Sequence, residues 1–243
     1  MSTSAADAEL AARLAKAGGQ IALAVRTSGA FSGAALGDAG DQIVNTFLTR
    51  ALQGQRPADG LLSEESRDKV ERLEKSRCWI IDPIDGTNEF AEGRPDWAIH
   101  VGLAVDGKPV TGAVALPARG LVLRSSQAAP LPSLPHRPRM VISRSRPAAE
   151  TERVAEALGA DTIALGSAGA KAMAVVLGEA EIYLHSGGQH EWDSCAPAAV
   201  ALAHGLHCSR LDGSPLRYNQ SDTYLPDLLI CRPEVAERVL NAI

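Results

Sequence analysis

A short apolar run that ends in carboxylates lies at residues 79–87 and reads Trp-Ile-Ile-Asp-Pro-Ile-Asp-Gly-Thr. Its apolar residues are typical of a buried strand, and Pro83 is expected to end that strand because it cannot donate to a hydrogen-bond ladder. Asp82 and Asp85 offer oxygen ligands for hard divalent cations, and the carbonyl of Ile84 can add another. The segment therefore predicts a metal site at the end of a rigid strand.

The two residues that follow these aspartates suit an anion. Gly86 permits the backbone to approach a ligand closely, and the amides of Gly86 and Thr87, at the start of a helical turn, would face a phosphate. The competing interpretation is structural, namely a strand followed by an Asx turn that caps a helix. We favour the functional interpretation, a metal-binding phosphate site.

A pair of metal ions requires carboxylates from several elements, because one strand end cannot surround both ions. Glu64 follows the apolar segment 60–63, and Asp193 precedes the alanine-rich segment 195–203. Asp193 taken alone is more often a helix N-cap than a ligand. The histidines are expected to be surface or packing residues, so the oxygen-rich set favours Mg²⁺ over zinc.

The composition is that of an ordinary globular protein. With 243 residues, 45% of them hydrophobic and 22% charged, the chain can bury a large core. It has no basic leader followed by an apolar run and no apolar stretch of about 18 residues, which argues against secretion and membrane insertion and favours the cytoplasm. A net charge of -5 without a basic tract argues against a nucleic-acid polymer as partner. The four widely spaced cysteines are expected to be buried thiols.

Helices and partly antiparallel strands are predicted for the first half. Apolar residues recur at helical spacing over 7–26, and a second helix is expected to begin near Asp41, which could be its N-cap. The charged run 67–77 is expected to be a solvated helix. Three segments are predicted to be strands in addition to 79–81: 60–63, 97–105 and 108–116. Asp106-Gly107 between the last two favours a type I′ turn.

The second half alternates strands and helices after a proline-rich loop. Residues 125–138 contain four prolines, which predicts a loop between two subdomains, 1–124 and 139–243. The predicted strands are 140–142, 162–165, 180–184 and 227–231, and the predicted helices are 148–158, 168–177 and 194–204. The predicted class is α/β, with an α+β N-terminal half and an α/β C-terminal half.

The acidic segments together resemble the signature of the inositol monophosphatase family of Mg²⁺-dependent, Li⁺-sensitive phosphatases. The resemblance rests on Asp82-Pro-Ile-Asp-Gly-Thr87, on Trp192-Asp193 and on Ser63-Glu64-Glu65-Ser66, and its order and spacing cover residues 41–219. Within the family the chain resembles the 3′-phosphoadenosine-5′-phosphate phosphatases, the bacterial 3′(2′),5′-bisphosphate nucleotidases of sulfate assimilation. That likeness rests on Gly86-Thr-Asn-Glu-Phe90, Glu191-Trp192-Asp193 and Asp212-Gly-Ser-Pro-Leu-Arg-Tyr-Asn219. Inositol-selective members usually have a carboxylate where this chain has Ser186.

The resemblance also implies an architecture, a cofactor and a set of site residues. It implies a layered αβαβα sandwich of the inositol monophosphatase and fructose-1,6-bisphosphatase type, a homodimer, and two to three Mg²⁺ ions per site. The implied metal ligands are Glu64, Asp82, the Ile84 carbonyl, Asp85 and Asp193, with Asp82 bridging two ions. Gly86, Thr87, Lys171 and Asp193 would contact the substrate, and Glu64, Thr87 and Asp41 would act in catalysis.

Two of these residues have specific implied roles. Thr87 would orient the attacking water and pass its own proton toward Asp41. Lys171 would lie beside the substrate's other phosphate, and the alternative is a solvated helix lysine.

The chain departs from the family pattern in two places. Only the short segment 36–40 precedes Asp41, where members often have a lysine and a longer loop that closes over the site. The family's SRSH-like segment is Ser143-Arg-Ser-Arg146 here, with arginine in place of histidine. An arginine can grip a phosphate bidentately.

The expected activity is hydrolysis of the small phosphorylated nucleotide 3′-phosphoadenosine 5′-phosphate to AMP and phosphate, with 3′-phosphoadenylyl sulfate as a second candidate substrate. An alternative within enzymes is an inositol-1-phosphate or fructose-1,6-bisphosphate phosphatase, because the metal motifs do not determine the alcohol. A rival of another class is a non-catalytic nucleotide-binding sensor. The presence of Thr87, Asp41 and Glu64 disfavours that rival.

Overall fold

The structure is a computed structural model that describes residues 3–243. Its helices are α1 (Thr3–Thr27), α2 (Gly33–Gln55), α3 (Thr87–Ala91), α4 (Thr151–Leu158), α5 (Ala168–Val176), α6 (Glu191–Ala203) and α7 (Pro233–Ala242), with 3-10 turns at Val70–Glu74 and Pro117–Arg119. Its strands are β1 (Gly60–Ser63), β2 (Arg77–Asp85), β3 (Ala98–Val105), β4 (Lys108–Leu116), β5 (Leu121–Arg124), β6 (Arg139–Ser143), β7 (Asp161–Leu165), β8 (Ile182–His190), β9 (His207–Ser209) and β10 (Tyr224–Cys231).

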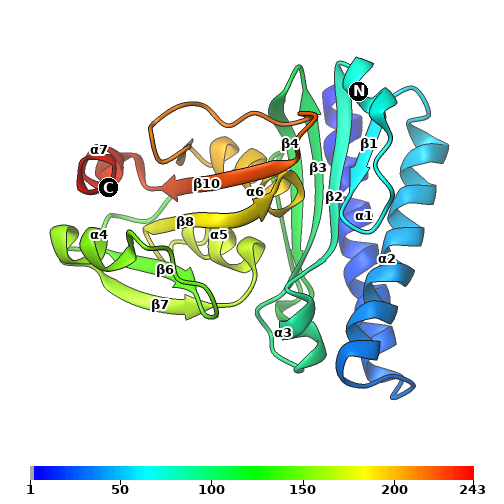
Figure 1. Ribbon diagram of the computed structural model, residues 1–243, viewed down its shortest axis with the longest axis horizontal. Coiled ribbons are helices and arrows are strands. Elements are labelled where there is room, and N and C mark those ends of the chain that lie inside the picture. Colours follow the sequence, from blue (N-terminus) through cyan, green and yellow to red (C-terminus); the bar gives the residue numbers. More distant parts are fainter. Residues whose placement is uncertain (1–2) are drawn as a thin grey trace.

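These elements stack in five alternating layers of helices and sheets (Figure 1). Helices α1 and α2 cover the outer face of the first sheet, and α4 and α7 cover the outer face of the second. Helices α5 and α6 lie between the two sheets and share a core with both. The predicted α/β class and the αβαβα arrangement that the resemblance implied are both confirmed.

Both sheets are mixed. The first has the strand order β1-β2-β3-β4-β5, and only β1 and β2 run parallel in it. The second has the order β7-β6-β8-β10-β9, with β7, β6 and β8 parallel and β10 antiparallel to both of its neighbours. Asp106 and Gly107 have φ values of 49° and 74°, as the predicted type I′ turn requires. The predicted strands of the first half and their partly antiparallel pairing are confirmed.

Strand β2 is covered by helices on both faces. Trp79 and Ile81 belong to the core formed with α1 and α2, whereas Cys78 and Ile80 belong to the core formed with α5 and α6. Because alternate side chains point to opposite faces, an uninterrupted apolar run suits a strand that is buried on both sides. The aspartates that follow this run are therefore held at the end of a rigid element.

Helix α6 approaches the first sheet closely because two glycines face it. Gly102 and Gly112 pair across β3 and β4. A Cβ on Gly102 would lie 2.9 Å from the amide nitrogen of Ala196, and a Cβ on Gly112 would overlap the Ala196 carbonyl oxygen. Glycine is needed at both positions for this contact. The contact brings the first turn of α6 toward the end of β2.

Helix α2 begins at Gly33, so the prediction that it begins near Asp41 is wrong. Asp41 lies inside the helix, is 5% exposed and is not an N-cap. Gly37 of this segment allows α2 to pack closely on α3, because a Cβ on Gly37 would lie only 2.7 Å from Cγ2 of Thr87. The segment before Asp41 is therefore helix rather than a short loop.

The charged run 67–77 is not a solvated helix, and that prediction is also wrong. It contains only the 3-10 turn Val70–Glu74, and Arg72 is 2% exposed. The Arg72 guanidinium pairs with Asp68 at 2.7 Å and donates to the side chain of Asn219 at 2.9 Å. The buried guanidinium of Arg72 therefore connects this segment to the loop before β10 by a hydrogen bond to Asn219.

The second half contains the predicted strands and helices, with two additions, β9 and α7, and the first half has one addition, β5. Strand β8 continues to His190, well beyond the predicted segment 180–184. Strands β5 and β9 and helix α7 were not predicted. The two strands are only four and three residues long, which leaves little pattern to detect. The apolar residues of α7 do recur at helical spacing, so the sequence held a signal for that helix.

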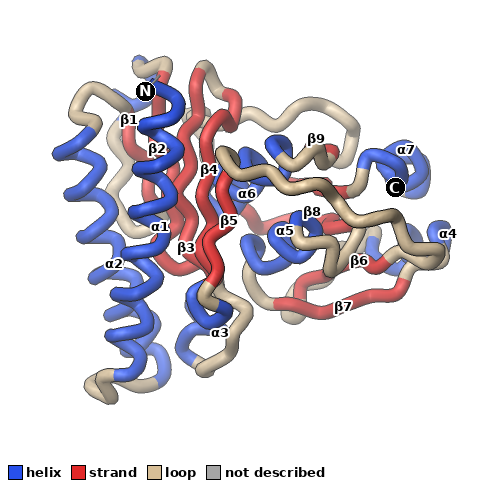
Figure 2. The backbone as a smooth tube through the Cα atoms, turned by 180° about the vertical axis from the view of Figure 1, so that it is seen from behind, coloured by secondary structure: helices blue, strands red, loops and turns tan. Residues whose placement is uncertain are grey.

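The proline-rich loop between β5 and β6 connects the first sheet to the second (Figure 2). We propose that residues 1–124 and 139–243 are two subdomains with a shared core. One apolar cluster combines residues of β2, β3 and β4 with residues of α5, α6 and the second sheet.

Two further observations bear on the expectations from composition. Among the helices of residues 3–243, none is both long and apolar enough to cross a bilayer. All four cysteines are free thiols, and Cys78, Cys195 and Cys231 are buried as predicted, whereas Cys208 is half-buried.

Candidate active site

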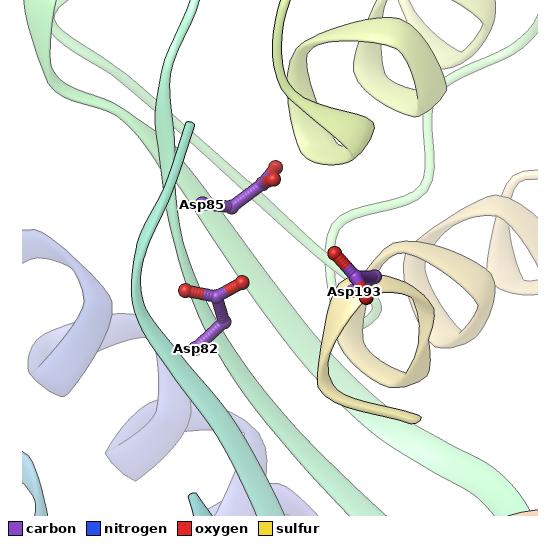
Figure 3. A group of neighbouring side chains, drawn as sticks. All are labelled: Asp82, Asp85 and Asp193. Atoms are coloured by element: carbon purple, nitrogen blue, oxygen red, sulfur yellow. The ribbon is translucent and has the colours of Figure 1, made fainter. Parts of the chain in front are cut away.

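Three aspartates that are distant in the sequence converge at the end of β2 (Figure 3). One carboxylate oxygen from each of Asp82, Asp85 and Asp193 lies within 4.8 Å of the other two. Asp82 and Asp85 belong to β2, and Asp193 belongs to the first turn of α6. Figure 3 shows the three side chains around a common space. A cluster of oxygen ligands suits a hard divalent cation.

An irregularity in β2 allows both of its aspartates to reach this space. Residues three apart on a regular strand point to opposite faces. The register with β3 shifts between Asp82, which pairs with His100, and Asp85, which pairs with Ala98. Pro83, which lacks an N–H, lies within the shift. The expectation that Pro83 ends the strand is wrong, because β2 continues to Asp85, but the ladder is interrupted there.

Asp85 is stabilised as an anion. Its Oδ1 accepts a hydrogen bond from the amide of Ala168 at 3.1 Å, and its Oδ2 accepts one from Gly169 at 2.5 Å, both at the N-terminus of α5. Nε2 of His100 lies 3.2 Å from the same Oδ2. Burial raises the pKa of Asp85, but His100, the positive charge of Lys171 and the Gly169 amide outweigh it, so the net pKa is lowered.

The pKa values of Asp82 and Glu64 are raised, in contrast to that of Asp85. Burial, followed by repulsion from Glu64, Asp85 and Asp193, raises the pKa of Asp82 well above its usual value. The pKa of Glu64 is raised to about 7, first by desolvation of its carboxyl group and then by repulsion from Asp193. The residue as a whole is nevertheless exposed. Oδ1 of Asp82 is buried and has no hydrogen-bond partner among residues 3–243.

These residues fit a divalent cation. The donor set consists of carboxylates without a thiol or imidazole, and it includes the unpaired buried oxygen of Asp82. A bound cation would offset the mutual repulsion that raises the pKa values of Glu64, Asp82 and Asp193. The chain therefore has a buried acidic cluster that can hold metal.

Asp193 both caps α6 and belongs to the cluster. Its Oδ2 accepts a hydrogen bond from the amide of His190 at 2.7 Å, within a capping box in which Asp193 is the third residue of the helix. Burial and then the Asp85 charge raise the pKa of Asp193 to about 6. The capping and ligand interpretations are compatible at this residue, although Asp193 is not the N-cap itself.

Thr87 connects the cluster to α2. Its hydroxyl oxygen lies 3.0 Å from Oδ2 of Asp41 and 3.1 Å from the carbonyl oxygen of Ile84. Burial raises the pKa of Asp41 to about 8, although the hydrogen bond from Thr87 lowers it. A hydroxyl that donates to Asp41 keeps lone pairs that can accept from a water. The pair can therefore orient a water and receive its proton.

The cluster opens into a cleft of ≈ 520 Å³ that both halves line. Gly86 and Thr87 line it together with Glu64, Asp85 and Asp193. Gly86 has a φ of 87°, and a Cβ there would lie 2.9 Å from Cβ of Ser167. Glycine therefore allows the end of β2 to lie against the start of α5.

Lys171 is buried beside the cluster, so the solvated-lysine alternative is wrong. It is 3% exposed, and its Nζ donates to the carbonyl oxygens of Gly166 and Ser167, the second at 2.8 Å. Nζ also lies 5.4 Å from the ring centre of Tyr183. Burial lowers the pKa of Lys171 to about 8, although Asp85 raises it. Of its three N–H bonds, one is left for a ligand in the cleft.

Two residues that the resemblance singled out have partners away from the aspartates. The Arg144 guanidinium lies 2.7 Å from Glu89 and 3.1 Å from Glu92. Ser186 donates to Glu150 at 2.7 Å and does not line the cleft. The position that holds a carboxylate in inositol-selective members therefore adds no carboxylate to the cleft.

Sequence reasoning missed His100 and the amides at the start of α5. His100 is fully buried, and its Nδ1 lies 3.0 Å from the carbonyl oxygen of Trp192, so it connects β3 to α6 as well as to Asp85. Burial lowers the pKa of His100, but Asp85 outweighs it and the net pKa is raised. The available signal was a histidine inside the predicted strand 97–105, beside the strand that carries the aspartates.

The sequence of this chain is similar to those of known phosphatases. The model of the inositol monophosphatase family matches residues 5–242. A Mycobacterium bovis protein named 3′-phosphoadenosine 5′-phosphate phosphatase is 53% identical over 219 residues, 86% of this chain and 82% of that protein. A Mycobacterium leprae protein of the same name is 49% identical and covers 98% of this chain and 93% of its own length. The 3′(2′),5′-bisphosphate nucleotidase CysQ of Escherichia coli K12 is 30% identical over 77% of this chain and 81% of its own.

Solved structures agree on the fold. CysQ from Bacteroides thetaiotaomicron has a TM-score of 0.81 at 22% identity and covers 93% of this chain and 97% of its own. An inositol monophosphatase from Anabaena has a TM-score of 0.78 at 18% identity and covers 100% of this chain and 96% of its own. At these identities the likeness supports the architecture alone.

Proposed function

We propose, since this chain belongs to the inositol monophosphatase family, that it is a phosphatase that hydrolyses 3′-phosphoadenosine 5′-phosphate to AMP and phosphate. The observation that carries the proposal is the convergence of Asp82, Asp85 and Asp193 beside the Thr87–Asp41 pair. The names of relatives at 49% and 53% identity support the choice of substrate. 3′-Phosphoadenylyl sulfate is a second candidate substrate.

The proposed cofactor is Mg²⁺, with two to three ions per site. The proposed ligands are Glu64, Asp82, the carbonyl oxygen of Ile84, Asp85 and Asp193, with Asp82 bridging. Mg²⁺ would neutralise the phosphoryl oxygens, lower the pKa of the attacking water and stabilise the departing ribose oxygen. Asp85 is already an anion, whereas the raised pKa values of Asp82, Glu64 and Asp193 mean that these ligands would release protons on binding.

The proton of the attacking water is proposed to leave through Thr87. The Thr87 hydroxyl would accept a hydrogen bond from the water while donating its own proton toward Asp41. A pKa of about 8 makes the ionised Asp41 carboxylate a stronger base than an ordinary aspartate, and it is the ionised form that would accept the proton. The water would then attack the phosphorus in line, without a covalent intermediate.

The remaining proposed contacts hold the phosphate. The amides of Gly86 and Thr87 would orient the phosphoryl group during attack. Lys171 would give its remaining N–H bond to the substrate's other phosphate, and its position beside Asp85 limits the net negative charge that the substrate meets.

The experiment that tests this proposal is phosphate release by the purified protein in Mg²⁺. The panel contains 3′-phosphoadenosine 5′-phosphate, inositol 1-phosphate and fructose 1,6-bisphosphate, and we expect the first to have the highest kcat/KM. Preference for either of the others would replace the substrate but keep the phosphatase. Tight nucleotide binding without any release would favour a sensor. Inhibition by Li⁺ at limiting Mg²⁺ would support the metal assignment.

We further infer from the resemblance that the protein is a cytoplasmic homodimer. Light scattering during gel filtration measures the mass directly. A particle with the mass of one chain, 25.4 kDa, would contradict the dimer.

A further inference from the structure

One wall of the cleft takes no part in the proposed chemistry. It is built by the C-terminal half, from residues 143–146 at the end of β6 and after it, and from His185, Gly188 and Gln189 of β8. The acidic cluster can engage only the phosphate that is hydrolysed. The rest of the substrate must therefore meet other residues of the cleft, and this wall is the part of the lining that remains.

Three cationic side chains line the cleft, and two of them are already engaged. Arg144 is paired with Glu89 and Glu92. Lys171 is buried, with two of its N–H bonds donated to backbone carbonyls. The Arg146 guanidinium is exposed and forms neither an ion pair nor a hydrogen bond with any of residues 3–243, and only its backbone amide is bonded, to Oγ of Ser143 at 3.1 Å. Among the three, Arg146 is therefore the cation whose guanidinium keeps all of its donors for a ligand.

The Arg146 side chain is given room by a glycine of β8. Gly188 has a φ of 72°, which L side chains rarely adopt. A Cβ on Gly188 would lie 3.0 Å from Nη1 of Arg146. The guanidinium thus lies against the strand with its planar set of five donors available at the cleft wall.

Two buried side chains of the same wall have unpaired acceptors. His185 and Gln189 are 5% and 4% exposed. Nε2 of His185 lies 2.8 Å from the carbonyl oxygen of Gly187, which can only accept, so Nε2 carries the proton and Nδ1 is an acceptor. Nε2 of Gln189 donates to the hydroxyl of Tyr183 at 2.9 Å. Nδ1 of His185 and Oε1 of Gln189 have no partner in the described part of the chain.

His185 adds no positive charge to this wall. Burial, then the positive charges of Lys171 and Arg146, lower the pKa of His185 and keep its imidazole neutral. The wall therefore combines one unpaired, exposed cation with two buried and uncharged polar side chains, His185 and Gln189.

We propose that Arg146 binds the phosphate that is not hydrolysed. This inference rests on the proposed function, because an adenosine bisphosphate has a second phosphate. Lys171 has only one N–H bond left, so Arg146 is the cation that determines the preference for a bisphosphate.

The test compares 3′-phosphoadenosine 5′-phosphate with adenosine 3′-monophosphate, which lacks only the second phosphate. Arg146→Gln is expected to lower kcat/KM for the bisphosphate about 10- to 100-fold, mostly through KM, and to lower that for the monophosphate by less than about twofold. Arg146→Lys is expected to recover part of the loss, because lysine keeps the positive charge but lacks the planar group that can bind a phosphate through two parallel hydrogen bonds.

Arg217→Gln is the matched control. Arg217 is an exposed arginine without an ion pair in the described residues, and it lines a different hollow of the surface together with Leu73 and Glu74. We expect kcat/KM of this variant to equal the wild-type value for both substrates. Equal losses on the two substrates in Arg146→Gln, or no loss on the bisphosphate, would overturn the assignment of Arg146.

Binding of AMP separates this inference from the proposed function. If the wild-type protein released phosphate from neither substrate, the proposed function would fail. The affinity for AMP, measured by calorimetry, would then decide the role of Arg146 without turnover. An affinity about tenfold weaker in Arg146→Gln would support the assignment, and an unchanged affinity would overturn it.

Discussion

Asp193 both accepts a hydrogen bond from the amide of His190 and belongs to the acidic cluster. One substitution can separate its role as a helix cap from its role as a metal ligand. Asp193→Asn keeps an oxygen that can accept from the amide of His190, so α6 stays capped, but it removes a negative charge from the cluster. Loss of a residue that only supports a metal ligand costs about 10- to 100-fold in activity, so loss of a ligand should cost at least about 100-fold.

The measurement is kcat at saturating Mg²⁺, with thermal unfolding to confirm the fold. Asp212→Asn, in an exposed loop, is the control and should retain full activity. A folded Asp193→Asn protein with near wild-type turnover would show that Asp193 is a cap only.

Thr87 is the second residue whose role can be isolated. Thr87→Ala is expected to lower the turnover number by about 10²- to 10⁴-fold, because a positioned proton transfer contributes that much, while Mg²⁺ affinity changes little. Thr87→Ser keeps the hydroxyl that bonds Asp41 and should retain most of the rate. Single-turnover kinetics and metal titration by calorimetry separate the two effects. A variant that lost only Mg²⁺ affinity would make Thr87 a structural support.

At the scale of elements, the contact of α6 with the first sheet determines where Asp193 lies. Gly112→Ala would place a Cβ against the Ala196 carbonyl, and overpacking of this kind costs ~1–3 kcal/mol in the free energy of unfolding. The displacement of α6 would also move Asp193 away from β2, so activity should fall further than stability predicts.

Denaturant unfolding and kcat measured on the same samples check this prediction. The control is Gly54→Ala near the end of α2, where a Cβ would meet nothing within 4 Å. We expect Gly54→Ala to be neutral or more stable by about 0.5–1 kcal/mol, with unchanged activity. Equal free energies of unfolding in the two variants would show that α6 can accommodate the Cβ of Gly112→Ala without a loss of stability.

The elements also explain what the sequence could predict. The run from Trp79 to Thr87 predicted the metal site because its apolar strand, its carboxylates and its turn residues are contiguous in the sequence. They therefore also lie next to one another in the folded chain. His100 was missed because its contact with Asp85 depends on the register of β2 and β3. The start of α2 was misplaced because glycine is a poor helix former, whereas Gly37 lies inside the helix and allows close packing against α3.

Across the whole molecule, the acidic groups make the stability of the metal-free protein depend on pH. The pKa is raised to about 8 in Asp41, to about 7 in Glu64 and Glu191, and to about 6 in Asp193. A carboxyl group whose pKa is higher in the folded state stabilises that state below its unfolded pKa of about 4, and this contribution is lost as pH rises through the folded pKa. The metal-free protein should therefore lose stability between about pH 5 and pH 8.

Thermal unfolding in EDTA and in Mg²⁺ over this pH range tests the prediction. The stabilisation by Mg²⁺ should grow with pH, because protons and metal compete for the same oxygens, and it should reach about 2.7 kcal/mol when Mg²⁺ is at 100 times its Kd. Asp41→Asn should flatten the pH dependence in EDTA. A Tm that is independent of pH in EDTA would contradict the assigned shifts.

The loop 125–138 joins two halves that are already held together by their common apolar cluster. A cut in that loop would leave Glu64, Asp82 and Asp85 on one fragment and Lys171 and Asp193 on the other. Each fragment alone would be inactive, since neither contains the full set of acidic side chains. Phosphate release would therefore report the reassembly of the two fragments, which makes this chain suitable as a split-enzyme reporter.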